Sequence, residues 1–377
     1  MDDCNDHSMD SFVQRIQGIA VGGKYHLVRK LGSGSFGNVY LGMATCLTPM
    51  AYNEISRSTG RDAESGNEVA MKLENHSVAP SLLQEEVGIY QSLAGQPGFP
   101  QVYWHGHHHD FTVLVFELLG PNLEDLFRYC GDQFSLKTTL MLADQLLRRF
   151  ESLHSHHYLH RDVKPENFLL GMGDGGNTVY MTDLGLAIYR HPERWISGSS
   201  PHRNETARPP QLLGTCRYAS INGHLGIAQS RRDDLEALGY MLVYFIRGRL
   251  PWQGLKAKRD AKYLLVLEKK QATSASELCD GLPTQFEEYM NYVRNLRYED
   301  QPDYQHLREM FKKLFRRQGF EYDDVFDWTV REFQRLETET QEPLASNDVG
   351  ERLGAEATKP SDDGSQDVAK ARRRKRR

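Results

Sequence analysis

The sequence predicts an α+β protein with two lobes, a strand-rich first part followed by a helix-rich second part. Short runs of β-branched and aromatic residues, bounded by Gly, Asn or His, fill the first third of the chain. From Leu136 onward the apolar residues recur at helical spacing instead. With 39% hydrophobic residues in a chain of 377, the composition supports a large core and excludes a wholly disordered chain.

The expected elements follow in chain order. We expect strands at residues 25–28, 38–41, 68–73 and 112–116. We expect helices at residues 81–93, 235–247, 276–296 and 304–316, together with a long one that begins at Leu136. The first of these helices carries Pro80 in its first turn, where proline is well tolerated.

The expected domain organisation is one two-lobed domain between two tails. Its boundaries are a flexible arm at 1–24, a domain at 25–335 whose lobes are 25–119 and 120–335, and a disordered tail at 336–377. Residues 48–66 separate two strands with polar, turn-forming residues and are expected to be a long loop inserted in the first lobe.

The formal net charge of −5 conceals an uneven distribution. Residues 372–377 are an unbroken run of six basic residues, so the rest of the chain carries −11. An acidic body argues against a nucleic-acid binder, whose footprint would be a basic domain. The basic end is typical of a nuclear-import signal or of a patch for an anionic surface, and a merely solvated tail is the alternative.

The cysteines, the N-terminus and the apolar runs of the sequence indicate in which cell compartment the protein is expected. Five widely spaced cysteines make no C-x-x-C pair, which argues against a zinc ribbon or a disulfide framework. The N-terminus is acidic where a secretory signal is basic and then apolar. The run 240–246 is far shorter than the roughly 18–20 residues of a membrane span, and no lipidation motif is present. We therefore expect a protein of the cytoplasm and nucleus with no stable membrane anchor.

A glycine-rich loop follows the first expected strand. The pattern G-x-G-x-x-G-x-V covers Gly32, Ser33, Gly34, Ser35, Phe36, Gly37 and Val39. Glycines let backbone N–H groups approach phosphate oxygens closely, and the same glycines also mark dinucleotide-binding folds. In those folds the glycines open a helix, whereas here another strand follows. A glycine hairpin without a ligand stays the plain alternative for this motif taken alone.

Lys72 ends an apolar strand run, where a buried ammonium needs an anion to offset its lost solvation. The following helix offers Glu85 and Glu86. We prefer Glu86 because it shares a helix face with Leu82 and Leu93. A lysine that reaches solvent is the alternative.

The run from His160 to Asn167 is much more specific. Its pattern H-R-D-x-K-P-x-N places the Asp162 carboxylate where it can meet a hydroxyl nucleophile, and Lys164 near a transferring phosphoryl group. Asp183, in a D-x-G turn sixteen residues after Asn167, completes an oxygen-rich pair suited to Mg²⁺.

In this order the motifs are the signature set of protein kinases. Residues from about 25 to 334 resemble a eukaryotic protein kinase of the serine/threonine type. Residues 118–127, 213–222, 229–234 and 250–256 resemble the casein kinase 1 family in particular. The strongest mark is Ser-Ile-Asn at 220–222, where other kinases have Ala-Pro-Glu.

The resemblance implies ATP and Mg²⁺ as cofactors and a role for each matching residue. Asp162 would orient the substrate hydroxyl, and Lys164 would stabilise the transferring phosphoryl group. Asn167 and Asp183 would hold Mg²⁺. The remaining ATP-binding positions, with Phe116 as gatekeeper, are Leu31, Gly32, Ser33, Gly34, Ser35, Phe36, Gly37, Val39, Ala70, Lys72 with its partner Glu86, Glu117, Leu119 and Leu169.

Substrate choice is a separate hypothesis. Arg217 and Lys262 match family positions that bind an anion near the activation segment. Further local positive charge comes from Arg190, Arg194, Arg203 and Arg208. We expect this cluster to select acidic or phosphorylated protein substrates through charge-assisted hydrogen bonds. Arginines solvated on a loop are the alternative for those that match no family position.

Three departures from the family pattern stand out. Leu184 replaces the usual Phe of D-F-G. Leucine can still fill an apolar slot, so we expect altered packing and inhibitor response rather than inactivity. Segments 48–66 and 195–211 are longer than in the family.

The resemblance implies a monomeric, active kinase that binds proteins and no nucleic acid. One rival is a pseudokinase scaffold, which usually lacks at least one of the four motif residues Lys72, Asp162, Asn167 and Asp183. The other is a dinucleotide-binding oxidoreductase, which shares only the glycine pattern.

Overall fold

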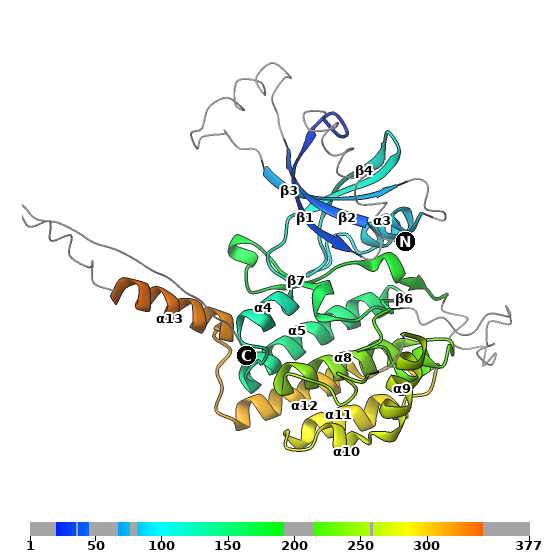
Figure 1. Cartoon of the computed structure of the whole chain (residues 1–377), viewed down its shortest axis with the longest axis vertical. Helices are drawn as coiled ribbons and strands as arrows, with labels where there is room; N and C mark the ends of the chain where they lie inside the picture. The colour runs from blue at the N-terminus through cyan, green and yellow to red at the C-terminus, as the bar shows by residue number, and fades with distance from the viewer. Residues whose placement is uncertain are drawn as a thin grey trace, which may run out of the picture. The chain divides into compact units, whose positions relative to one another are not determined.

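The computed structural model describes residues 20–34, 37–44, 67–75, 81–191, 214–256 and 259–341, and it has the two expected lobes (Figure 1). The first lobe is one antiparallel sheet of strand order β1-β2-β3-β5-β4 with one helix. Its elements are β1 (Tyr25–Gly34), β2 (Gly37–Ala44), β3 (Asn67–Asn75), α3 (Leu82–Ser92), β4 (Val102–His108) and β5 (Phe111–Glu117).

Strand β3 lies in the middle of the sheet and is paired along both edges, and the side chains of residues 69–74 on both of its faces are buried. This explains why its sequence lacks the polar alternation of a half-exposed strand. Its register places Lys72 opposite Val39 of β2 and Ala70 opposite Phe116 of β5. The first two glycines of the glycine-rich loop belong to β1, and Gly34 pairs with Gly37 across the gap to β2.

Helix α3 is held at its start by β3. The Glu74 carboxylate, at the end of that strand, accepts hydrogen bonds from the backbone N–H of Leu82 and Leu83 and from the hydroxyl of the N-cap residue Ser81. A carboxylate at a helix N-terminus satisfies free N–H groups and favours the helix dipole. This contact fixes the helix that carries Glu86 against the strand that carries Lys72.

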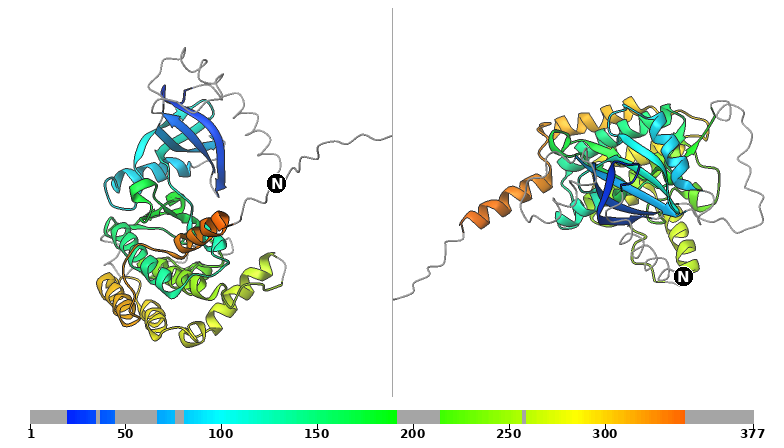
Figure 2. Two further views of the ribbon diagram at one scale, coloured as in Figure 1. Left: turned by 90° about the vertical axis from the view of Figure 1, so that its left-hand side faces the viewer. Right: turned by 90° about the horizontal axis from the view of Figure 1, so that it is seen from above.

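The second lobe is mainly helical, and Figure 2 shows its helices stacked below the strands of the first lobe. Its helices are α4 (Leu123–Tyr129), α5 (Leu136–Ser155), α7 (Ile221–His224), α8 (Arg231–Arg247), α9 (Arg259–Ala272), α10 (Ala275–Leu278), α11 (Thr284–Asn295), α12 (Tyr304–Arg317) and α13 (Asp327–Gln341). Two small hairpins pair β6 (Tyr158–Leu159) with β9 (Ile188–Tyr189), and β7 (Phe168–Leu170) with β8 (Val179–Met181). None of the described helices is long and apolar enough to cross a membrane.

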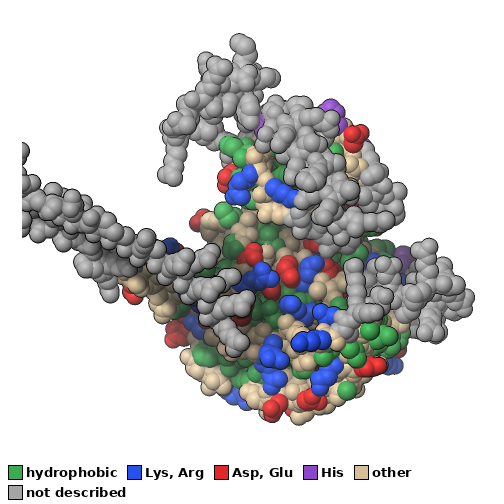
Figure 3. All heavy atoms as spheres, viewed as in Figure 1, with side chains coloured by type: hydrophobic (Ala, Val, Ile, Leu, Met, Phe, Trp, Pro, Cys, Tyr) green, Lys and Arg blue, Asp and Glu red, His purple; other side chains and the backbone are tan. Residues whose placement is uncertain are grey.

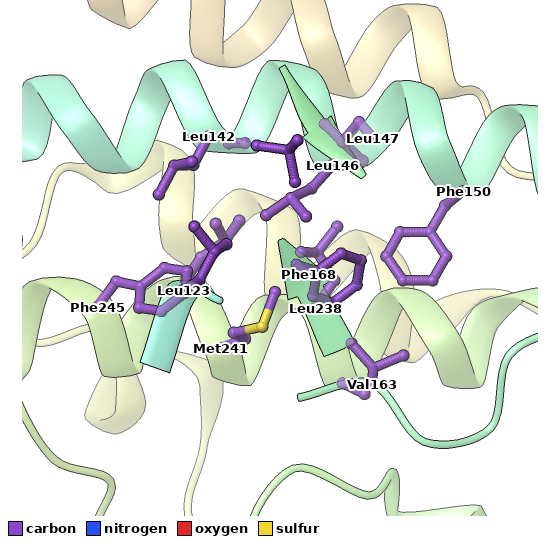
Figure 4. Close-up of a cluster of buried hydrophobic side chains, with 14 of the residues drawn as sticks. Leu123, Leu142, Leu146, Leu147, Phe150, Val163, Phe168, Leu238, Met241 and Phe245 are labelled. Carbon is purple, nitrogen blue, oxygen red and sulfur yellow. The ribbon is translucent and has the colours of Figure 1, made fainter. Parts of the chain in front are cut away.

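The main core lies between α5 and α8. Figure 4 shows Leu142, Leu146 and Phe150 of α5 facing Leu238 and Phe245 of α8. All five are 0% exposed. Fully burying each such side chain stabilises the fold by roughly 1.5–3 kcal/mol. The core therefore forms a rigid base for the loop between β6 and β7, which carries the chemistry-bearing residues 160–167.

Most expected elements are present, but helices α4, α9 and α13 and the short strands β6, β7 and β9 were not expected. Further differences concern β4, the helix expected at 276–296 and the start of α3. Strand β4 was not expected, although its alternating burial is typical of an edge strand. The single helix expected at 276–296 is divided into α10 and α11, because Gly281 and Pro283 interrupt it. Helix α3 begins at Leu82 with Ser81 as its N-cap, and Pro80 lies outside the described residues. The residue buried in its first turn is Leu83 rather than Leu82.

The domain boundaries stay predictions. Helix α13 continues past the expected boundary at 335 as far as Gln341. The expected loop 48–66, the remainder of the tail and most of the arm lie outside the described residues.

Candidate active site

Lys72 lies between two carboxylates. Its Nζ is 2.7 Å from Oε2 of Glu86 and 2.7 Å from Oδ1 of Asp183. The expected pairing with Glu86, and not with the exposed Glu85, is therefore present. Residues from a strand, a helix and a distant turn thus meet at one ammonium group.

The three charged groups of this cluster differ in how the structure shifts their pKa values. Burial lowers the pKa of Lys72, but Glu86 and Asp183 outweigh it and raise that pKa, so the ammonium stays charged. Burial raises the pKa of Glu86 more than Lys72 lowers it. For Asp183 burial is outweighed by Lys72, and the net effect lowers its pKa. Asp183 is therefore the better-ionised carboxylate of the two.

The β7–β8 hairpin brings Asn167 and Asp183 to the same end of the site. Phe168 pairs with Met181, and the Thr182 N–H donates to the Asn167 carbonyl at 2.9 Å. Asp183 has a left-handed backbone, with φ of 58°, and its N–H donates to the Tyr90 hydroxyl at 3.1 Å. Strained backbone of this kind persists only where its surroundings hold it, and it is concentrated at functional sites.

The residue after Asp183 anchors this turn in the core. Leu184 is 0% exposed, and its N–H donates to Oε1 of Glu86 at 3.1 Å. The expectation that leucine fills the apolar slot of the turn is confirmed.

Asp162 is held by three neighbours. Lys164 Nζ lies 2.7 Å from its Oδ2, and the Thr215 hydroxyl donates to its Oδ1 at 2.8 Å. The Asn167 side-chain N–H₂ donates to the Asp162 carbonyl oxygen at 2.8 Å. The carboxylate is therefore fixed in orientation while it remains an acceptor.

A buried aspartate supports the loop from beneath. Asp234 of α8 accepts hydrogen bonds from the N–H of His160 at 2.8 Å and of Arg161 at 2.9 Å. It also contacts His154 Nε2 at 2.9 Å, and His154 Nδ1 meets the Tyr304 hydroxyl. This network ties the loop to helices α5, α8 and α12 and holds Arg161 at a φ of 66°.

The donor set fits a hard cation that brings its own phosphate ligands. Asn167 uses its nitrogen on Asp162, so its Oδ1 is the atom that can accept a cation, and Asp183 offers a carboxylate. Among the described residues no group of three or more His, Cys, Asp or Glu side chains could hold a metal ion. Mg²⁺ commonly takes only one or two protein carboxylates and completes its shell with phosphates and water.

The expected adenine-binding positions surround the junction of the two lobes. Ala70 is buried at the β3–β5 pairing, and Leu31 is 41% exposed on β1. Glu117 ends β5, and Leu169 forms a bridge with Asn122 just after the connection at Leu119. Ser35 and Phe36 lie outside the described residues.

The expected anion-binding pair lies on the second lobe. Arg217 is half-buried, with its guanidinium 5.6 Å from the Tyr218 ring centre and 5.4 Å from that of Tyr244. Lys262 is exposed on α9, near enough to Cys216 to lower that thiol's pKa against the larger effect of burial, which raises it. Figure 3 shows Lys and Arg side chains gathered over this lobe, with acidic side chains among them. Of the four additional arginines, Arg190 is described, and Arg194, Arg203 and Arg208 lie outside the described residues.

Sequence reasoning missed three contributors to this site. Thr215 contacts Asp162, Tyr90 contacts Asp183 and Asp234 supports the loop. Thr215 stands in the quoted run 213–222, and Asp234 in 229–234, so both lay in motifs whose individual roles were not assigned. The only signal for Tyr90 was its place on the inner face of the helix that carries Glu86.

One comparison with known families bears on this arrangement. A family model described as "Protein kinase domain" matches residues 25–315, which is more than half of the chain.

Proposed function

Because this chain belongs to the protein kinase family, we propose that it is a casein kinase 1-type enzyme that transfers the γ-phosphoryl group of ATP to serine or threonine in acidic or phosphorylated protein sequences. Protein kinases phosphorylate proteins with ATP, and they generally need a divalent metal. The choice of Ser/Thr, the acidic preference and Mg²⁺ are the parts that we add.

The observation that carries the proposal is the complete set of charged groups around one site. Lys72 is paired with both Glu86 and Asp183, and Asp162 with Lys164. A degenerate scaffold would be expected to have lost at least one of these groups. Phosphoryl transfer needs little covalent chemistry from the protein, so positioning and charge stabilisation account for most of the rate.

Each residue has a task in this reaction. Lys72 binds the ATP phosphates and is kept charged by its two carboxylates. Asp162 accepts a hydrogen bond from the substrate hydroxyl and aims its oxygen at the phosphorus, and Lys164 offsets the charge that spreads over the transferring group. Asn167 and Asp183 would hold Mg²⁺, which would offset the negative charge of the phosphates.

The substrate preference is proposed from charge. Arg217 and Lys262 place two cations near the turn 215–219, beside the hydroxyl-binding Asp162. A phosphate on the peptide can take bidentate, charge-assisted hydrogen bonds from Arg217. The body of the protein is otherwise acidic, so this local cluster is the feature that favours an anionic peptide.

Transfer of labelled phosphate from ATP to two peptides tests the proposal. One peptide carries phosphoserine upstream of a target serine, and the other carries unmodified serine there. We expect the primed peptide to be preferred by the wild type and all transfer to be lost in Asp162→Asn. The double variant Arg217→Ala with Lys262→Ala should lose the preference, whereas Lys269→Ala, a change on the same helix, should keep it. Equal signals from wild type and Asp162→Asn would contradict the enzyme proposal.

Location in the cytoplasm and nucleus is also proposed, from the basic run 372–377. Deletion of these six residues should reduce the nuclear fraction of a tagged protein, and an unchanged distribution would contradict nuclear import.

A further inference from the structure

Lys270 of α9 is a buried cation outside the residues assigned to ATP or to phosphoryl transfer. It is 0% exposed. Removing an ammonium group from water is costly unless its N–H groups find acceptors. The groups that offset the lost solvation of the Lys270 ammonium therefore show which part of the fold it supports.

The three N–H groups of the ammonium find three acceptors. Nζ lies 3.1 Å from the Cys216 carbonyl oxygen, 2.5 Å from the Ala219 carbonyl oxygen and 3.2 Å from Nε2 of His224. An ammonium has three donors and no acceptor, so this set matches the charged form. The ring centres of Tyr240 and Trp252, at 4.9 and 5.0 Å, add cation–π attraction.

Both carbonyl groups belong to the turn 215–219 and flank Arg217. The Thr215 carbonyl accepts from the N–H of Tyr218 and of Ala219, both at 3.0 Å, which closes the turn. Trp252 Nε1 donates to the Arg217 carbonyl at 2.7 Å. Lys270 and Trp252 thus bind three of the carbonyl groups of this turn. The turn, held in place, presents Thr215 to Asp162 and Arg217 to the substrate.

The surroundings of Lys270 bring its pKa close to neutral pH. Burial lowers its pKa to about 7, Glu236 and Cys216 act to raise it, and Arg294 acts to lower it. Tyr240 faces it with its ring. His224 stays neutral at pH 7, because burial and Lys270 lower its pKa to about 4. Its Nε2 lies 3.2 Å from Lys270 Nζ and 3.2 Å from the Cys216 carbonyl oxygen, so it accepts a hydrogen bond from the ammonium in the tautomer that carries its proton on Nδ1.

We propose that Lys270 is a positioning residue for the peptide substrate, whose ammonium clamps the turn 215–219 and thereby sets Arg217 against the peptide and Thr215 against Asp162. The proposal rests on the proposed function, since it deepens the role of the same peptide site. When Lys270 loses its proton the carbonyl of Ala219 loses a strong donor, and the turn loosens. ATP binding, which uses residues of the first lobe and the β7–β8 hairpin but none of the turn 215–219, is not affected.

Steady-state kinetics of Lys270→Met tests the proposal, with Lys269→Met as the matched control on the same helix. Methionine keeps the length of the chain and removes the donors. We expect KM for the primed peptide to rise about tenfold, equivalent to about 1.4 kcal/mol, while KM for ATP stays within about twofold. Trp252→Phe, which removes the donor to Arg217 and keeps a smaller aromatic ring beside Lys270, should also raise peptide KM. Unchanged peptide KM, or an equal loss of ATP binding, would overturn the proposal.

The pH profile of the wild type gives a readout that needs no variant. A peptide primed with aspartate instead of phosphate keeps its charge between pH 6 and 8.5. Its KM should rise in the wild type as the pH passes about 7, and it should be high and flat in Lys270→Met. A flat profile in the wild type would contradict the clamp.

Hydrogen exchange separates failure of this proposal from failure of the proposed function. The amides of Tyr218 and Ala219 should exchange faster in Lys270→Met than in the wild type, and Lys269→Met should leave them unchanged. Hydrogen exchange can be measured even if the wild type phosphorylates neither peptide. In that case the proposed function would be wrong, while faster exchange in Lys270→Met would still support the clamp. Unchanged exchange in Lys270→Met would overturn the clamp.

Discussion

The Thr215 hydroxyl donates a hydrogen bond of 2.8 Å to Oδ1 of Asp162. This contact joins the turn 215–219, which lies 53 residues further along the chain, to the loop that carries the proposed catalytic carboxylate. The other carboxylate oxygen is paired with Lys164. The orientation of Asp162 therefore depends on both segments.

Thr215→Val should lower kcat and leave KM for ATP unchanged, because valine keeps the shape and removes the donor. A hydrogen bond to a charged group contributes about 1.5–3 kcal/mol, so the expected loss is roughly ten- to hundredfold. Thr215→Ser keeps the hydroxyl and should retain most of the activity. Equal kcat values for the valine and serine variants would show that the hydrogen bond does not orient Asp162.

Glu86→Gln should lower kcat/KM for ATP by about tenfold or more. The amide removes the negative charge that holds Lys72, which would then pair with Asp183 alone. Glu85→Gln, an exposed change at the neighbouring position, is the control and should match the wild type. A similar effect of the two substitutions would contradict the assignment of Glu86.

Gly214→Ala should reduce both stability and kcat. Gly214 has a φ of 87°, and a Cβ there would lie 2.5 Å from the Arg161 carbonyl oxygen and 3.1 Å from Oδ1 of Asp162. Gly281→Ala is a matched control, because Gly281 has a φ of 75° but open space around a Cβ. The left-handed backbone alone should destabilise that variant by about 1–2 kcal/mol with unchanged kcat. Thermal unfolding of both variants measures the backbone strain, and peptide kinetics measure the effect of the clash on Asp162. Equal kcat values for Gly214→Ala and Gly281→Ala would show that the clash does not disturb Asp162.

The protein should lose stability as the pH falls below about 6.5, partly because of His154. Burial lowers the pKa of His154 although Asp234 acts to raise it. The unfolded chain therefore takes up a proton at a pH where the folded protein does not. The contribution of His154 is complete above its unfolded pKa and is lost as the pH falls toward the folded value.

His154→Gln tests this pH dependence. Glutamine removes the titrating group, so the variant should be less stable than the wild type at pH 7.5 and lose less stability between pH 7.5 and 5.5. His306→Gln, an exposed change on α12, should keep the wild-type slope in urea unfolding. Identical slopes for wild type and His154→Gln would contradict the role of His154.

The sequence by itself determined the α+β class and the identity of most groups at the site. Period and composition were sufficient for α5, α8 and strands β1, β2, β3 and β5, because burial of one face imposes a pattern on local sequence. Fixed spacing within 160–167 was enough to relate Asp162, Lys164 and Asn167, since a short loop gives its side chains few arrangements. The preference for Glu86 over Glu85 also followed from helix geometry alone.

Only the tertiary structure decided which distant groups meet. Lys72 and Asp183 are 111 residues apart in sequence, and nothing local indicates that one ammonium joins both Asp183 and Glu86. The same holds for Lys270, which reads as one of two adjacent lysines on a helix until its neighbours in space are known. The surroundings of a buried charge are assembled from several elements, and these surroundings decide whether a lysine is a solvated surface group or the support of a substrate-binding turn.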